Sequence, residues 1–255
     1  MSEDIVHDMN NNLIHNSEQF VVLCLIQQLL KSHGKNLADF PGFSNIDESN
    51  ITFTPNLLHE QCQYKIEEQT VVADKNESLL NSDQHHVYQK VVDATEQHTN
   101  TNATAYFVDG PGGSGKTFLY NTILARIRSK GKIALAVASL GIAAELLNGG
   151  RTAHSRFKIP IPISETCTCT CNISRNSALA DLTKNTAIIV WDEAPMIHKH
   201  ILECVHRTLC DLTQIDKPFG GKVVLLGGDF RQVLPVIRHG TQAEIINSYI
   251  MQSFL

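Results

Sequence analysis

The chain has 255 residues, of which 42% are hydrophobic, and its formal net charge is −5. This length supports one sizeable core with an appendage, or two small domains. No apolar run approaches the roughly 20 residues of a membrane span, and the first residues are acidic, so we expect neither a transmembrane helix nor a secretory signal. Seven cysteines, an odd number, argue against a disulfide framework and favour a reducing, intracellular compartment.

The net charge is unevenly divided along the chain. Residues 1–99 carry 5 Lys and Arg against 15 Asp and Glu, whereas residues 100–255 carry 16 against 11, which leaves +5. The positive second part permits a nucleic-acid partner, although many domains with this charge bind none.

Residues 1–78 are rich in Asn, Gln, His and acidic residues, and we predict an acidic segment that is partly helical or disordered. One helix is expected there, with Ser17 as its cap, apolar positions at Phe20–Leu30 and Gly34 as its stop. Residues Asp39–Pro55 have the turn chemistry of a linker or surface loop.

Residues 79–255 alternate short apolar runs with helical patterns, beginning with a helix from Ser82 to about Glu96. Further helices are expected at Lys116–Ser129 and from Gly141 to Asn148. The predicted strands are Ala105–Val108, Ile133–Ala138, Ala187–Trp191 and Lys222–Gly228. Continuous β-branched runs separated by helices indicate a parallel sheet that is buried on both faces. We therefore predict a three-layer α/β domain that binds ligands at the carboxyl ends of its strands.

The segment GPGGSGKT satisfies the eight-position phosphate-binding loop completely. Its glycines let backbone N–H groups converge on phosphate oxygens, and the following helix offers its positive N-terminus. Lys116 is expected to reach the β- and γ-phosphates of ATP, and the Thr117 hydroxyl to bind Mg²⁺. The predicted nucleotide-binding residues are Gly110, Pro111, Gly112, Gly113, Ser114, Gly115, Lys116 and Thr117.

A second constellation, IIVWDEAP, delivers two carboxylates at a strand end. We expect Asp192 to hold Mg²⁺ through its water shell and Glu193 to accept a proton from the attacking water. This pair is typical of an ATP hydrolase, whereas a kinase would exclude water. The guanine-specificity Asn-Lys-x-Asp of GTPases is absent.

A third constellation, LLGGDFRQ, brings Asp229 and Gln232 to the end of a strand. The neutral amide of Gln232 suits a sensor of the γ-phosphate, because it donates to a phosphate oxygen when ATP is bound and loses that partner afterwards. We therefore group Lys116, Asp192, Glu193 and Gln232 as the candidate catalytic residues.

Gly-Asp-x-x-Gln after Asp-Glu is a mark of superfamily-one helicases. Residues 80–250 resemble the first motor domain of the Pif-one family of DNA helicases, and WDEAPM and GGDFRQVLPV are most similar to the helicase part of Helitron-type transposons. The resemblance implies a RecA-like P-loop NTPase domain. It also implies ATP hydrolysis coupled to 5′-to-3′ translocation on single-stranded DNA and to unwinding, in DNA repair, recombination, telomere maintenance or transposition. For the compartment, we expect an intracellular location where DNA is found, with the nucleus favoured and the mitochondrion left open.

The resemblance also implies residue roles. LNSDQ is similar to the adenine-reading motif of the family, which assigns Gln84 to the adenine edge. ASLGIAA and RTAHSRF are similar to its contacts with single-stranded DNA. The implied DNA contacts are Ser139, Gly141, Thr152, His154 and Ser155. From the residues alone, His154 is equally well an ordinary surface or core histidine.

Two alternatives remain open. A superfamily-one motor has a second RecA-like domain that supplies arginines to the γ-phosphate, but no second set of motifs precedes Leu255, and Arg231 and Arg238 lie on the first domain. The chain is therefore alternatively a truncated ATP- and DNA-binding remnant without unwinding activity. The other alternative is a small-molecule or nucleoside kinase, which has no use for Gln232. The oligomeric state is open.

Cysteine and histidine clusters invite a metal interpretation. The CTCTC run at residues 167–171 has one-residue spacing, unlike the usual zinc knuckles. The pairs four residues apart are His200/Cys204 and His206/Cys210. They fall on different faces of a helix, and we favour a surface strand or loop for the CTCTC run and no metal at either place.

Overall fold

The computed structural model describes residues 37–40, 64–96, 105–163, 169–232, 235, 237 and 240–255. The helix predicted between Ser17 and Gly34 lies outside these residues. A short 3-10 helix, η1 (Leu37–Asp39), belongs to a first unit, and a second compact unit runs from Pro55 to Leu255.

The second unit is built on one sheet of five parallel strands in the order β1-β5-β4-β2-β3. The strands are β1 (Ala105–Asp109), β2 (Ile133–Ala138), β3 (Arg151–Thr152), β4 (Thr186–Asp192) and β5 (Val223–Gly228). The predicted parallel α/β sheet is therefore confirmed, with four of its strands where the apolar runs placed them. The fifth strand, β3, has only two residues, which are too few to show a hydrophobic pattern in the sequence.

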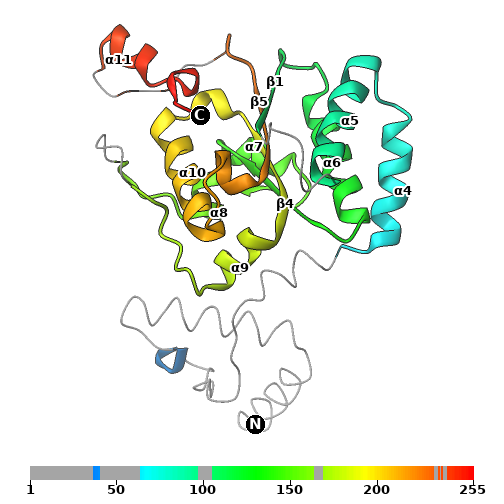
Figure 1. Cartoon of the computed structure of the whole chain (residues 1–255), viewed down its shortest axis with the longest axis horizontal. Coiled ribbons are helices and arrows are strands. Elements are labelled where there is room, and N and C mark those ends of the chain that lie inside the picture. The colour runs from blue at the N-terminus through cyan, green and yellow to red at the C-terminus, as the bar shows by residue number, and fades with distance from the viewer. Residues whose placement is uncertain are drawn as a thin grey trace. The chain divides into compact units, whose positions relative to one another are not determined.

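Helices cover both faces of the sheet, which gives the predicted three layers (Figure 1). The helices of one face are α5 (Ser82–Glu96), α6 (Lys116–Ser129) and α7 (Gly141–Glu145). Those of the other face are α8 (Ala153–Phe157), α9 (Ala178–Asn185) and α10 (Lys199–Thr213). The remaining described elements of this unit are α4 (Ile66–Glu77), η3 (Ala194–Met196), η4 (Pro218–Gly221), α11 (Gln242–Asn247) and η5 (Ile250–Gln252).

The sequence of β2, IALAVA, shows how the strand divides the two cores. Successive side chains of a strand point to opposite faces. Ile133, Leu135 and Val137 lie in the core beneath α8, α9 and α10, and the three alanines lie in the core beneath α5, α6 and α7. The small alanine side chains let α6 pack closely against this face of the sheet.

Helix α4 extends the layer formed by α5 and α6. The guanidinium of Arg126 on α6 donates to Asp74 and Glu77 of α4, each at 2.6 Å, and its Nε donates to the Tyr88 hydroxyl of α5 at 2.7 Å. We predicted a domain boundary between residues 78 and 79. The structure differs, because α4 lies before that point and packs on the α/β domain through these contacts.

The cysteines of the described residues are free thiols. Cys171 and Cys204 are buried with their sulfurs 3.8 Å apart, and His206 accepts a hydrogen bond from the backbone N–H of Phe219 at 2.9 Å. Within the described ranges, no group of three or more His, Cys, Asp or Glu side chains is arranged to hold a metal ion. Cys167 lies outside those ranges. None of the helices described is both long enough and apolar enough to span a bilayer.

Candidate nucleotide and DNA site

The predicted site residues gather at the carboxyl edge of the sheet. The phosphate loop follows β1, Gln232 follows β5, Asp192 ends β4 and Ser139 follows β2. Because all five strands are parallel, their carboxyl ends meet at one edge. Along this edge the phosphate loop lies toward one side, the predicted DNA-contacting segments lie toward the other, and β4 stands between them.

The phosphate loop joins β1 directly to α6. Gly113 and Gly115 have φ angles of 79° and 83°, a left-handed conformation that favours glycine, and Gly115 caps the N-terminus of α6. The Gly110 N–H donates to the Gly228 carbonyl at 3.1 Å, which ties the loop to the end of β5. The Lys116 ammonium turns back into the loop and donates to the Gly110 carbonyl and, at 3.1 Å, to the Pro111 carbonyl.

Gln84 lies against the same loop. Its Nε2 donates to the Ser114 carbonyl at 3.2 Å, and a Cβ added to Gly115 would stand 2.6 Å from this nitrogen. Asn81, which the sequence reasoning missed, exchanges two hydrogen bonds with Gln84: the Asn81 N–H donates to Oε1 at 3.2 Å and the Gln84 N–H donates to Oδ1 at 2.9 Å. This reciprocal cap of α5 fixes Gln84 beside the loop, although its contact with adenine stays a prediction.

The acid pair follows β4 as expected. Asp192 is buried, with 4% of its surface exposed, and its Oδ1 accepts the Glu193 N–H at 2.9 Å. Burial raises the pKa of Asp192, while the Glu193 N–H and the Lys116 charge act in the opposite direction. Burial and the Asp192 charge both raise the pKa of Glu193, and Lys116 again opposes this. The Lys116 charge therefore acts on both acids, as a shared site requires.

Glu193 has an unusual backbone conformation. Its φ of 52° and ψ of 37° place a non-glycine residue in the left-handed region. Such a conformation costs free energy of order 1 kcal/mol or more, and it directs the side chain away from the course that a continuing strand would give it. A raised pKa together with a fixed direction suits a general base.

Tyr120 is a residue of this site that the sequence reasoning missed. It lies on α6, one turn after the loop, and its fully buried hydroxyl has no hydrogen-bond partner among the described residues. Burial raises the pKa of Tyr120, and the charges of Asp192 and Glu193 raise it further, so the hydroxyl keeps its proton. A buried donor of this kind needs an acceptor. The charged groups that act on this hydroxyl are Asp192 and Glu193.

The segment after β5 faces the phosphate loop. A Cβ added to Gly112 would stand 3.6 Å from Nε2 of Gln232, so the amide lies beside the loop, and its role as a γ-phosphate sensor stays a prediction. The buried carboxylate of Asp229 accepts from the backbone N–H and from Nε of Arg231, each at 2.9 Å, and these contacts lower the pKa of Asp229. Nη2 of Arg231 is also 3.6 Å from Asp109, the last residue of β1. Arg238 lies outside the described residues.

These residues fit a magnesium–ATP complex. The loop glycines leave its backbone open to phosphate oxygens, Lys116 supplies the cation, and Thr117 and Asp192 supply the oxygen ligands that Mg²⁺ prefers. Asp192 is buried and Glu193 half-buried, and burial raises the pKa of both carboxyls in spite of the Lys116 charge.

The predicted DNA contacts lie at the ends of β2 and β3. Gly141 is exposed and begins α7, and Thr152 caps α8 by accepting the N–H of Ser155 at 3.3 Å. His154 is half-buried, and burial lowers its pKa, so it is neutral near pH 7 and suits hydrogen bonding or stacking rather than charge pairing. Ser139 hydrogen-bonds to the strand of the acid pair. The structure thus brings the five residues to one part of the edge, and their contact with DNA stays a prediction.

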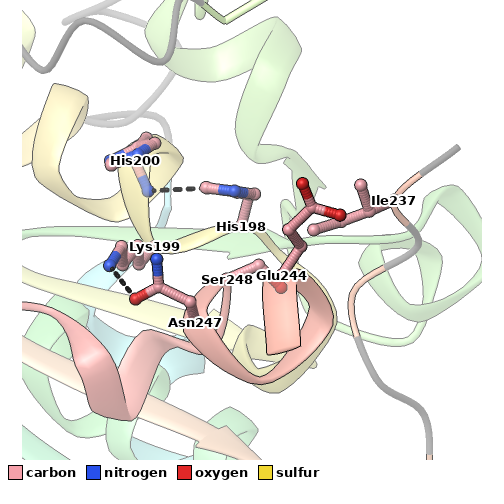
Figure 2. Close-up of a pocket in the computed structure, with 7 residues that line it drawn as sticks. All are labelled: His198, Lys199, His200, Ile237, Glu244, Asn247 and Ser248. Atoms are coloured by element: carbon pink, nitrogen blue, oxygen red, sulfur yellow. Dashed lines mark hydrogen bonds between the residues drawn. The ribbon is translucent and has the colours of Figure 1, made fainter. Parts of the chain in front are cut away.

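A separate pocket lies between the start of α10 and α11 (Figure 2). It is lined by His198, Lys199, His200, Ile237, Glu244, Asn247 and Ser248. Its polar groups support the fold: the Lys199 ammonium donates to Asn247 Oδ1 at 2.9 Å, and the His198 ring accepts the His200 N–H at 3.1 Å. None of its lining residues belongs to the predicted site.

Comparison with known proteins agrees with this geometry. The PIF1-like helicase family model matches residues 79–255. The ATP-dependent DNA helicase Pif1 of Psychrobacter sp. (strain PRwf-1) is 36% identical over 149 residues, which cover 58% of this chain and 22% of that protein. The human ATP-dependent DNA helicase PIF1 is 29% identical over 132 residues, which cover 52% of this chain and 20% of that protein.

Solved structures give the same result. The crystal structure of the Pif1 helicase from Candida albicans aligns with a TM-score of 0.56 and 26% identity, covering 69% of this chain and 36% of that one. The Bacteroides Pif1 helicase in complex with ADP-AlF3 and ssDNA aligns with a TM-score of 0.53 and 28% identity, covering 66% and 38%. This chain therefore spans about a fifth of the curated relatives named here and just over a third of these structures. With the family model matching more than half of its length, the chain belongs to the PIF1-like helicase family.

Proposed function

We propose that this chain is a motor domain of an ATP-dependent DNA helicase, which binds Mg²⁺–ATP and single-stranded DNA at one sheet edge and couples hydrolysis to translocation and unwinding. The observation that carries the proposal is the convergence of Lys116, the Asp192–Glu193 pair and Gln232 on the phosphate loop. The Bacteroides Pif1 helicase forms a complex with ADP-AlF3 and ssDNA, which supports the same pair of ligand classes here.

Each residue has a distinct part in the proposed reaction. Lys116 and the backbone of the loop would hold the phosphates, and Thr117 would hold a magnesium ion, which would supply neutralisation of the phosphate charge. Glu193 accepts the proton of the attacking water, and Asp192 would hold the magnesium ion together with Thr117. Gln232 lies beside the loop and contacts Asp229, which follows β5. Loss of the phosphate contact at the Gln232 amide would therefore alter the contacts at the end of β5.

The 5′-to-3′ direction of translocation rests on the family resemblance. We propose a nuclear location, with the mitochondrion as the alternative. Roles in DNA repair, recombination, telomere maintenance or transposition rest on the same resemblance. The alternative is a chain that binds ATP and DNA without unwinding.

The test is the steady-state release of phosphate from ATP, with and without single-stranded oligonucleotide, with Glu193→Gln as the blank. The proposal expects turnover above the blank that single-stranded DNA stimulates. Binding of ATP and oligonucleotide without turnover would support the alternative. Transfer of phosphate to a small acceptor, indifferent to DNA, would contradict both and favour a kinase.

A further inference from the structure

Ser139 is joined to the strand of the acid pair by three hydrogen bonds. Its backbone N–H donates to the Asp192 carbonyl at 3.1 Å, and its hydroxyl reaches the same oxygen at 3.5 Å. The indole Nε1 of Trp191 donates to the Ser139 hydroxyl at 3.1 Å. Ser139, which the resemblance implies in DNA contact, is thus hydrogen-bonded to Trp191 and Asp192, the two residues before the proposed general base.

The hydrogen of the Ser139 hydroxyl makes only a weak hydrogen bond within the protein. A serine hydroxyl has one donor hydrogen and two acceptor positions, and Trp191 occupies one acceptor position. At 3.5 Å the bond to the Asp192 carbonyl is long, and that carbonyl already accepts the Ser139 N–H. A phosphate oxygen of a nucleic acid is a stronger acceptor, because it is charged. The hydrogen is therefore available to a phosphate, while the indole holds the oxygen in place.

Trp191 also reaches the second DNA-contacting segment. Its side chain is 1% exposed and packs against the ring of Phe157, with centroids 6.0 Å apart. Phe157 ends α8, the short helix that begins after Thr152 and carries His154. One buried ring thus contacts Ser139 by a hydrogen bond and α8 by packing, and its own backbone continues into Asp192.

We propose that Trp191 is a positioning residue that aims the Ser139 hydroxyl at a phosphate of single-stranded DNA and links that contact to the Asp192–Glu193 pair. This inference rests on the proposed function and deepens it by naming the internal link between the two ligand sites. Trp191 is buried and contacts neither ligand. It connects the DNA contact of Ser139 to the Asp192–Glu193 pair through its indole N–H.

The chain offers its own probe, because Trp191 is its only tryptophan. Unlabelled oligothymidylate is titrated into the purified chain while intrinsic fluorescence is followed, and the anisotropy of a labelled oligothymidylate reports binding independently. We expect the fluorescence to change with the same midpoint as the anisotropy. In Ser139→Ala, oligonucleotide at saturation should leave the fluorescence unchanged.

A double-substitution cycle tests the hydrogen bond itself. Trp191→Phe keeps a buried ring and removes the N–H, so we expect roughly fivefold weaker oligonucleotide binding, the scale of one hydrogen bond. Ser139→Ala should weaken binding at least as much, and the double variant should bind no more weakly than Ser139→Ala alone. Ser129→Ala is the matched control, because its hydroxyl bonds to Arg126 of its own helix, at 2.7 Å.

The outcomes separate the two proposals. Failure of the chain to bind oligothymidylate overturns the proposed function and this link together. Binding that leaves the Trp191 fluorescence unchanged overturns the link alone. The link is also overturned if the double variant loses affinity for oligonucleotide by the product of the two single-variant losses, because Trp191 and Ser139 would then act independently. The wild-type titration decides the matter even if Trp191→Phe fails to fold.

Discussion

The hydroxyl of Tyr120 on α6 lies where a Cβ of Gly227 on β5 would stand. Helix and strand therefore approach each other through a position that tolerates no side chain, immediately before the segment that carries Asp229 and Gln232. The same hydroxyl lies in the field of Asp192 and Glu193. The close approach holds the first turns of α6 and the end of β5 together beneath the phosphate loop.

Gly227→Ala should destabilise the domain by roughly 1–3 kcal/mol, because overpacking forces the Tyr120 ring or the strand to move. The measurement is the free energy of unfolding in denaturant. Gly141→Ala is the control, since a Cβ there meets nothing within 4 Å. Adding Tyr120→Leu to Gly227→Ala should restore part of the loss. A Gly227→Ala variant as stable as the natural chain would contradict the packing.

Lys116→Ala should abolish nucleotide binding, because it removes the cation that faces the phosphates and the two acids. Titration with a fluorescent ATP analogue measures this. Lys130→Ala is the control, since Lys130 follows the other end of α6 and pairs with Glu96. Unchanged ATP affinity in Lys116→Ala would remove the phosphate-loop assignment.

Glu193→Gln should leave ATP binding intact and remove hydrolysis, because the amide cannot take a proton from water. Retained turnover would mean that another group is the base.

The pH dependence of turnover tests the same residue. Because the pKa of Glu193 is raised, its base form is lost as pH falls through a value above the usual glutamate range. Hydrolysis should therefore decline at a higher pH than an exposed carboxylate would give. Because the pKa of Asp192 is raised as well, ATP binding measured over the same interval separates protonation of Glu193 from that of Asp192. A rate that stays level down to the ordinary glutamate range would count against Glu193.

Gln232→Ala should slow hydrolysis by roughly tenfold or more while changing ATP affinity only slightly, because the amide acts on the transferring phosphate rather than on the bulk of the nucleotide. Parallel measurements of turnover and of analogue binding separate the two effects. The control is Gln89→Ala on the exposed face of α5, which removes only a hydrogen bond to Asp93. An equal loss of binding and turnover would place Gln232 in ground-state binding instead.

The fold was largely predictable because its signals are local. The apolar runs of β2 and β4 and the glycines of the phosphate loop specify elements within a few residues, and a parallel sheet then collects their ends at one edge. β3 and α8 were not predicted, since two- and five-residue elements carry too little pattern.

The missed site residues depend on contacts between distant segments. Nothing near Tyr120 in the sequence reports that β5 approaches it, although the Gly227–Gly228 pair at a strand end is a sign of close approach. From the sequence, Trp191 is indistinguishable from an ordinary core residue. Only the structure shows that its indole N–H donates a hydrogen bond to Ser139. The helix α4 was assigned to the acidic segment because its tie to the domain, Arg126, lies far along the chain.

The most direct test of the central claim, that one sheet edge couples nucleotide to DNA, is the affinity of Glu193→Gln for labelled oligothymidylate with and without saturating Mg²⁺–ATP. Hydrolysis is blocked in this variant, so the two affinities are equilibrium quantities, and a coupling must appear equally in the affinity for ATP with and without DNA. We predict that ATP changes the affinity for oligonucleotide at least several-fold, with the same factor in the reciprocal measurement. Both ligands binding with no effect on each other would contradict the account.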